Sequence, residues 1–162
     1  TIGLEILEDL DAVDAIVVPW GGGGLACGVA SAVAALRPAT RVYPVEAETA
    51  TPLTASFAAG RAMTITPTPS FVDGMGGKSV FDSMWPLAGL LMQRPLVVSL
   101  AQIAAAIKLL AERSKVVAEG AGAAPVAAAL AGMPGAAKVV CVISGGNIDS
   151  ARLATVLRGE IP

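Results

Sequence analysis

The stretch VVPWGGGGLACG, residues 17 to 28, holds four consecutive glycines between an apolar run and an alanine-rich segment. Glycine loses the most conformational entropy on folding and is the poorest helix former after proline, so four in a row need a compensating role. Glycines between a strand and a helix can form an anion site, because backbone N–H groups converge there and the helix N-terminus adds partial positive charge. We therefore interpret Gly21 to Gly24 as a phosphate-binding loop. The alternative is a tight strand–helix turn with no ligand.

The two commonest phosphate motifs do not fit this loop. In the dinucleotide fingerprint GxGxxG the third glycine would fall on Cys27, with Gly28 one residue late, although Glu46 follows at a suitable distance. A P-loop would need a lysine after the glycines, where Leu25 stands. The loop therefore indicates phosphate but neither of these two classes.

Composition excludes several kinds of chemistry. The chain has 162 residues, 54% of them hydrophobic, and this length fits one domain. The net charge of -2 gives no electrostatic reason to expect nucleic acid. No apolar run reaches the ~18 residues of a membrane span, and the first residues do not form a signal peptide. There is no histidine, which excludes a Ser-His-Asp triad and a histidine-based zinc site. The two cysteines, Cys27 and Cys141, lie in apolar segments and indicate a reducing, cytoplasmic setting.

Short β-branched runs alternate with alanine- and leucine-rich segments along the chain. The clearest runs, IVV and VVCVI, are apolar without alternation, as in strands buried on both faces of a parallel sheet. This alternation predicts an α/β fold in layers. The expected strands are 15–19, 41–45, 96–98 and 138–143, the expected helices 2–10, 25–36, 99–113, 121–131 and 149–157, and 64–78 is a long loop.

A second glycine cluster follows the last expected strand. The stretch CVISGGNID, residues 141 to 149, repeats the order of apolar strand, small residues and helix. Ligands of α/β sheets bind at that end of the strands. Between the two clusters, KVVAEGAGAA at 115–124 places Glu119 among small residues, where it could equally begin a helix.

Together, these segments resemble the fold type II pyridoxal phosphate enzymes, and more narrowly their threonine/serine dehydratase branch. The matching segments are GGGGL at 21–25, VDG at 72–74, AERSKVVAEGAGAAPVAA at 111–128 and SGGNID at 144–149. The resemblance implies a three-layer α/β fold with a parallel sheet, like that of tryptophan synthase β. It also implies that residues 1–162 form only the C-terminal part of the large domain, which binds pyridoxal 5'-phosphate. Thr1 would then follow a break in a longer chain.

The resemblance also assigns roles to individual residues. The glycine loop and Leu25 would wrap the cofactor phosphate, and the hydroxyl of Ser144 would meet the pyridine nitrogen. Glu119 would lie near the cofactor ring, while Gly145 and Gly146 would let the backbone approach it. The cofactor-binding residues expected on this basis are Gly21, Gly22, Gly23, Gly24, Leu25, Glu119, Ser144 and Gly145.

The resemblance implies that the catalytic lysine is missing. The family's Schiff-base lysine lies in an N-terminal Ser-x-Lys-x-Arg-Gly type segment, and no such segment is present. Among the four lysines only Lys78, in a glycine-rich stretch, merits comparison, and its surroundings match nothing in the family. We therefore expect no catalytic residue on this chain, and we expect the N-terminal half and most of the small substrate domain to be absent from it.

A metal site is also considered and is not predicted. Many relatives bind a cation beside the phosphate loop, and Glu46 and Ala50 match two of those positions. Pro52 stands where some relatives have an aspartate ligand. Helix capping or surface exposure explains Glu46 and Glu48 equally well.

The implied function is dehydration and deamination of L-threonine or L-serine to a 2-oxo acid and ammonia by a cytoplasmic lyase. This chain, inactive alone, would supply the phosphate cup and the pyridine-side wall. Its partners would be an amino-acid substrate, the missing N-terminal half and further copies in a homo-oligomer, with no nucleic acid and no membrane. The alternatives are a stand-alone, non-catalytic phosphate- or nucleotide-binding module and a dehydrogenase domain. Threonine, serine or aryl-serine as substrate, and lyase or racemase as activity, stay open.

Overall fold

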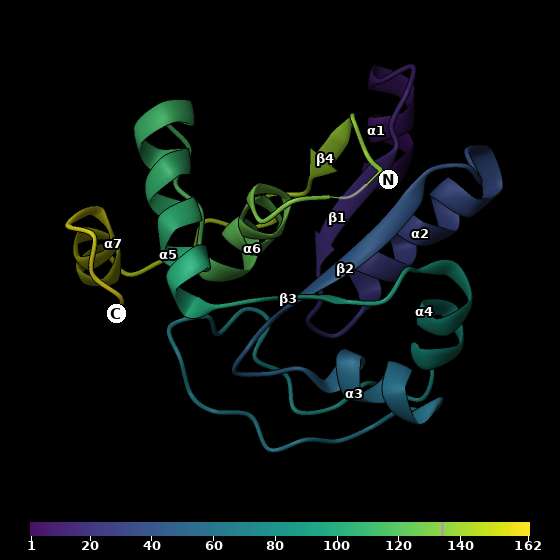
Figure 1. Cartoon of the computed structure of the whole chain (residues 1–162), viewed down its shortest axis with the longest axis horizontal. Coiled ribbons are helices and arrows are strands. Elements are labelled where there is room, and N and C mark those ends of the chain that lie inside the picture. Colours follow the sequence, from purple (N-terminus) through teal and green to yellow (C-terminus); the bar gives the residue numbers. More distant parts are fainter. Residues whose placement is uncertain (134) are drawn as a thin grey trace.

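A four-stranded parallel sheet forms the centre of the computed structural model, which describes residues 1–133 and 135–162 (Figure 1). Its strands are β1 (Ala15–Pro19), β2 (Arg41–Ala47), β3 (Leu96–Val98) and β4 (Val139–Cys141), in the order β3-β2-β1-β4. All three neighbouring pairs are parallel, which confirms the expected sheet type. β4 is shorter than the sequence predicts because its ladder to β1 ends at the pair of Cys141 and Val17.

Helices cover both faces of this sheet, so the expected three-layer fold is confirmed. Ile16, Val18 and Trp20 pack with α1 (Ile2–Asp9), α2 (Gly24–Leu36) and α4 (Trp85–Leu91). Val17, between them, packs on the other face with α5 (Leu100–Leu109), α6 (Gly120–Leu130) and α7 (Ser150–Leu157). All five residues of β1 are buried, as a strand covered on both faces requires.

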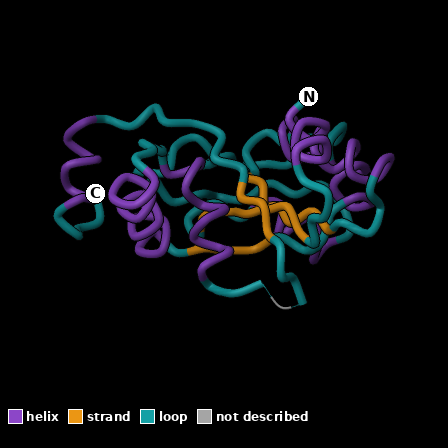
Figure 2. The backbone as a smooth tube through the Cα atoms, turned by 90° about the horizontal axis from the view of Figure 1, so that it is seen from above, coloured by secondary structure: helices purple, strands orange, loops and turns teal. Residues whose placement is uncertain are grey.

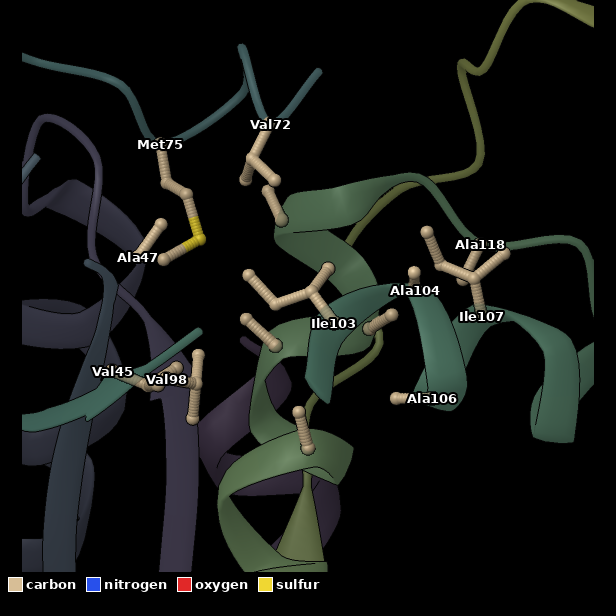
Figure 3. Close-up of a cluster of buried hydrophobic side chains, with 14 of the residues drawn as sticks. Val45, Ala47, Val72, Met75, Val98, Ile103, Ala104, Ala106, Ile107 and Ala118 are labelled. Carbon is tan, nitrogen blue, oxygen red and sulfur yellow. The ribbon is translucent and has the colours of Figure 1, made fainter. Parts of the chain in front are cut away.

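The long loop between α3 (Pro52–Ala59) and α4 joins the core at the carboxyl edge of the sheet. Figure 3 shows Val72 and Met75 from this loop in the same cluster as Val45, Val98 and Ile103. Both loop side chains are only 2% exposed. Burial of two apolar side chains therefore holds an otherwise irregular segment over the ends of the strands.

The longest expected helices are present, with shifted ends. Ser99 begins α5 with a capping box, since Gln102 N–H donates to its hydroxyl and the Gln102 side chain accepts from Ser99 N–H. The helix continues as a π-helical turn, Leu110–Ser114. The sequence does not predict the short helices α3 and α4, whereas the loop expected at 64–78 is confirmed.

The overall arrangement is elongated, with the N- and C-termini at opposite ends (Figure 2). Among the described residues, no helix combines the length and the apolar character needed to cross a bilayer.

Candidate functional site

A pocket of about 190 Å³ lies where β1 and β4 end. The two strands are parallel neighbours, so the segments that follow them emerge at the same edge of the sheet. The chain reaches β2 on one side of β1 and β4 on the other, and such a reversal of strand order opens a crevice for ligands. The residues that line the pocket are Pro19, Gly21, Gly22, Gly23, Gly24, Leu25, Gly74, Glu119, Ala121 and Ser144.

The glycine loop turns sharply from β1 into α2 at Gly23. Gly23 is the N-cap of α2 and has a φ of 91°, a left-handed conformation that favours glycine. A Cβ atom there would stand 2.7 Å from Cη2 of Trp20, whereas a Cβ atom at Gly24 would meet nothing within 4 Å. Glycine is therefore required at Gly23 by the fold, and at Gly24 its small size leaves the pocket open.

The backbone amides of this loop are free to bind a ligand. Residues 21–26 donate no hydrogen bond to any described residue, and the first amide of α2 with a partner is that of Cys27, which donates to Gly23. The N-cap offers no side-chain acceptor either. Unpaired amides at a helix N-terminus attract an anion, since the helix dipole adds to them.

The side chain of Trp20 packs against the glycine loop and supports it. This side chain is 1% exposed and packs against Gly23, and its indole Nε1 has no hydrogen-bond partner among the described residues. The loop therefore rests on a rigid aromatic ring that makes no polar contact of its own.

Glu119 directs its carboxylate into the pocket although it occupies a helix-start position. It is the N-cap of α6, but its side chain makes no capping hydrogen bond. Instead, Oε1 lies beside Gly74 and Gly145, close enough that a Cβ atom at either glycine would crowd it. Glu119 N–H donates to the Gly145 carbonyl over 3.0 Å. The carboxylate is thus left available to a ligand, and it is the one charged side chain among the described residues that line the pocket.

Ser144 is held by close backbone packing of the segment that follows it. A Cβ atom at Gly122 would stand 2.5 Å from the Gly145 carbonyl oxygen, and one at Gly146 would stand 2.5 Å from that of Val117. Side chains at these glycines would push the Ser144 segment away from α6 and from Val117, which precedes it. This packing explains why small residues surround both Glu119 and Ser144.

The structure brings the expected site residues together. Seven of the eight line the pocket directly, and Gly145 contacts Glu119 just behind it. Their binding of a cofactor stays a prediction. The sequence does not assign Pro19, Gly74 and Ala121 to the site; the only signal for Gly74 is its place in the segment VDG.

Lys78 lies outside this group, and the described lining of the pocket contains no lysine or arginine. Lys78 is exposed, and its backbone carbonyl accepts a hydrogen bond from Ile65 N–H. An anion in the pocket would therefore be held by backbone amides and the helix dipole.

Glu46 caps a helix, one of the alternatives left open by the sequence. Its carboxylate is fully buried and accepts hydrogen bonds from the amides of Leu53 and Thr54 and from the Thr54 hydroxyl, at 2.7 to 2.8 Å. Burial raises the pKa of the Glu46 carboxyl despite these three donors. Within the described residues there is no cluster of three metal-ligating side chains.

Comparison with known proteins agrees with this geometry. The profile of the family described as "Pyridoxal-phosphate dependent enzyme" matches residues 1–145. The L-threonine ammonia-lyase of Thermotoga maritima is 44% identical over 150 residues, which cover 92% of this chain and 37% of that protein. Processed threonine deaminase isoform 2 from Solanum lycopersicum superposes with a TM-score of 0.90 at 28% identity, over 98% of this chain and 48% of that one. Maize serine racemase superposes with a TM-score of 0.88 at 34% identity, over 97% and 51%.

The chain is much shorter than the proteins it matches. The chain spans from 37% to 50% of the curated relatives it matches.

Proposed function

Because this chain belongs to the family of pyridoxal-phosphate dependent enzymes, we propose that its full-length protein converts L-threonine or L-serine to a 2-oxo acid and ammonia. The observation that carries the proposal is the pocket itself, where unpaired amides of the glycine loop, the Glu119 carboxylate and the Ser144 hydroxyl meet. Each side of this pocket suits a different part of the cofactor.

The glycine loop suits the cofactor phosphate. Residues 21–26 offer amides that have no partner among the described residues, and α2 points its positive end at the same place. No cationic side chain lines the described pocket, so binding would depend on the loop keeping its shape. The buried ring of Trp20 supports that shape from below.

Ser144 suits the ring nitrogen of the cofactor. Bound pyridoxal phosphate supplies an electron-withdrawing ring that acidifies the α-proton of an attached amino acid. A serine hydroxyl can donate or accept a hydrogen bond but carries no charge, so it would not hold the ring nitrogen protonated. This moderate electron withdrawal suits elimination of a β-hydroxyl better than a long-lived carbanion.

Glu119 would limit how the ring can sit. Its carboxylate accepts hydrogen bonds only, and it is packed between Gly74 and Gly145 with little room to move. It therefore favours a ligand that presents a donor on that side and disfavours one that presents an anion.

The remaining parts of the reaction belong to the rest of the protein. We propose that the missing half supplies the Schiff-base lysine and the site for the substrate carboxylate, and that the protein acts as a cytoplasmic homo-oligomer. Its two free cysteines support a reducing compartment: Cys27 is buried, and burial raises the pKa of the Cys141 thiol to about 11.

The direct test is turnover by the full-length protein with pyridoxal phosphate. We expect 2-oxo acid and ammonia from L-threonine or L-serine. We expect Ser144→Ala to retain the cofactor but lose about 2- to 10-fold in kcat, the size of one lost hydrogen bond between neutral groups (~0.5–1.5 kcal/mol). A matched control is Ser150→Ala, outside the pocket at the start of α7. Absence of turnover of either amino acid by cofactor-loaded protein would refute the proposal.

Racemisation is a second candidate because a serine racemase is among the structural neighbours at 34% identity. The same incubation separates the two reactions. A lyase releases ammonia, whereas a racemase converts L-serine to D-serine and leaves the total amount of serine unchanged.

A further inference from the structure

Arg152 on α7 connects two segments that line the pocket, the loop that contains Gly74 and the segment that begins with Ser144. Its Nη1 donates to Oδ2 of Asp73 over 3.1 Å, and its Nε lies 3.7 Å from Oδ2 of Asp149. Asp73 is 79 positions away in the sequence and belongs to the long loop between α3 and α4. One guanidinium thus lies between two carboxylates from separate parts of the chain.

Each carboxylate adjoins a part of the pocket. Asp73 immediately precedes Gly74, whose carbonyl oxygen lies 3.1 Å from where a Cβ atom of Gly21 would stand. Asp149 closes the segment that begins with Ser144 and serves as N-cap of α7 without making a capping hydrogen bond. A shift of either segment would therefore change the width of the pocket.

Few other interactions hold the loop around Asp73 on its solvent-facing side. Val72 and Met75 are buried and hold the loop from below, but Asp73 and Gly74 themselves are exposed. The Asp73 side chain has Arg152 as its hydrogen-bond partner among the described residues. Burial of Val72 and Met75 keeps the loop packed over the ends of the strands. The ion pair of Asp73 with Arg152 additionally holds the loop toward α7.

We propose that Arg152 is a positioning residue that joins the Gly74 loop to the Ser144 segment and so sets the width of the cofactor pocket. Arg152 itself does not line the pocket. The inference rests on the proposed function only for the identity of the ligand. The joining of the two segments is a property of the chain.

Exposure sets the size of the expected effect. The side chains of Arg152 and Asp73 are 40% and 68% exposed, so solvent and salt screen the pair. Exposed ion pairs contribute little, and we expect about a two- to fivefold change in cofactor affinity. The effect should shrink as ionic strength rises.

The test is a double-mutant cycle in the full-length protein with Asp73→Asn and Arg152→Gln. Two readouts are measured: the dissociation constant of pyridoxal phosphate, from its absorbance, and hydrogen exchange of the amides of residues 72–77 without cofactor. We expect each single variant to weaken binding and speed exchange, and the double variant to match the singles. The control is Arg158→Gln, whose ion pair with Glu160 lies at the C-terminal end of α7, away from the pocket.

The outcomes separate the inference from the function. Additive effects, or exchange in residues 72–77 unchanged by Arg152→Gln, would overturn the positioning role even if the cofactor binds. Failure of the unaltered protein to bind pyridoxal phosphate would instead overturn the proposed function, and the exchange measurement would still decide the role of Arg152. Binding weakened equally by the Arg158→Gln control would assign the effect to net charge and refute the inference.

Discussion

Two glutamates of this chain perform tasks that their positions in the secondary structure would not suggest. Glu119 stands at a helix start, where a carboxylate commonly caps the first amides, yet its side chain turns into the pocket. Glu46 lies in a strand and caps α3 instead. The sequence shows that both residues are acidic, but only the three-dimensional packing decides which carboxylate faces a ligand.

Gly23 provides a test of the glycine loop. Gly23→Ala should lower the free energy of unfolding by about 1–3 kcal/mol, because alanine is strained at a positive φ and its Cβ would clash with Trp20. It should also weaken binding of pyridoxal phosphate by the full-length protein. Denaturant unfolding and cofactor titration measure the two effects.

The control for this variant is a second glycine, which lies within α2. At Gly28 a Cβ atom would meet nothing within 4 Å, so Gly28→Ala should stabilise α2 by up to about 1 kcal/mol. Equal behaviour of the two variants would show that the loop does not need glycine at Gly23.

Glu46 should make stability depend on pH. Because burial raises the pKa of its carboxyl, the folded chain keeps this proton to a higher pH than the unfolded chain does. The resulting stabilisation is complete below the ordinary value of 4.5 and is lost as pH rises through the folded pKa. Glu46→Gln should abolish this fall, as measured by denaturant unfolding from pH 4 upward.

Asp14 supplies a control of opposite sign. Its carboxylate accepts hydrogen bonds from the amides of Lys138 and Ala137, which lower the pKa of Asp14 from its ordinary value of 3.8. Its contribution is present above that value and is lost as pH falls through the folded pKa. Asp14→Asn should therefore alter only the acid limb of the curve. A rise of stability with pH that depends on Glu46 would contradict the assignment.

At the scale of elements, the sequence predicts those that carry a strong local pattern. β1 and β3 have the expected bounds, and α5 begins at the expected cap, Ser99. These elements have unbroken β-branched runs or an apolar face with a capping box, and such signals lie within a few neighbouring residues.

The helices that the sequence does not predict, α3 and α4, are stabilised by contacts with residues outside their own segments. α3 has eight residues and obtains its cap from Glu46, which belongs to a strand, while Pro52 stands at its start. α4 has seven residues, and Trp85 at its start packs edge-on against Phe57 of α3 at 5.4 Å. Such short helices depend on tertiary contacts, which no local pattern encodes.

The parts of the site divide in the same way, into those with a local sequence signal and those that depend on tertiary contacts. The glycine loop and the Ser144 segment could be recognised from local stretches, and both line the pocket. The contribution of Gly74 and the link from Asp73 to Arg152 depend on a loop whose path is set by the burial of Val72 and Met75. Contacts across 79 positions have no local signature in the sequence.

At the scale of the whole molecule, the sheet has an unpaired edge. β4 has β1 as its neighbour on one side only, among the described residues, and all three of its residues are half-buried. Open strand edges favour pairing with other chains. Together with the short span relative to its relatives, this edge gives the isolated chain a surface prone to self-association.

Expression of residues 1–162 alone provides the corresponding prediction. We expect concentration-dependent self-association in sedimentation velocity. The full-length protein at the same concentration should give one discrete species, because we expect its remaining residues to cover the β4 edge and so remove the template for pairing. A monomeric, stable chain 1–162 would contradict this expectation and would favour the alternative of a self-sufficient phosphate-binding module.

The support beneath the glycine loop has an optical consequence. Trp20 is one of only two tryptophans, it is 1% exposed, and its indole N–H has no partner among the described residues. An indole in such an apolar environment emits at short wavelength, and a chromophore bound above Gly23 would accept its excitation energy. With Trp85 replaced by phenylalanine, the fluorescence of Trp20 alone would report, without any label, when the loop is occupied and when it loosens.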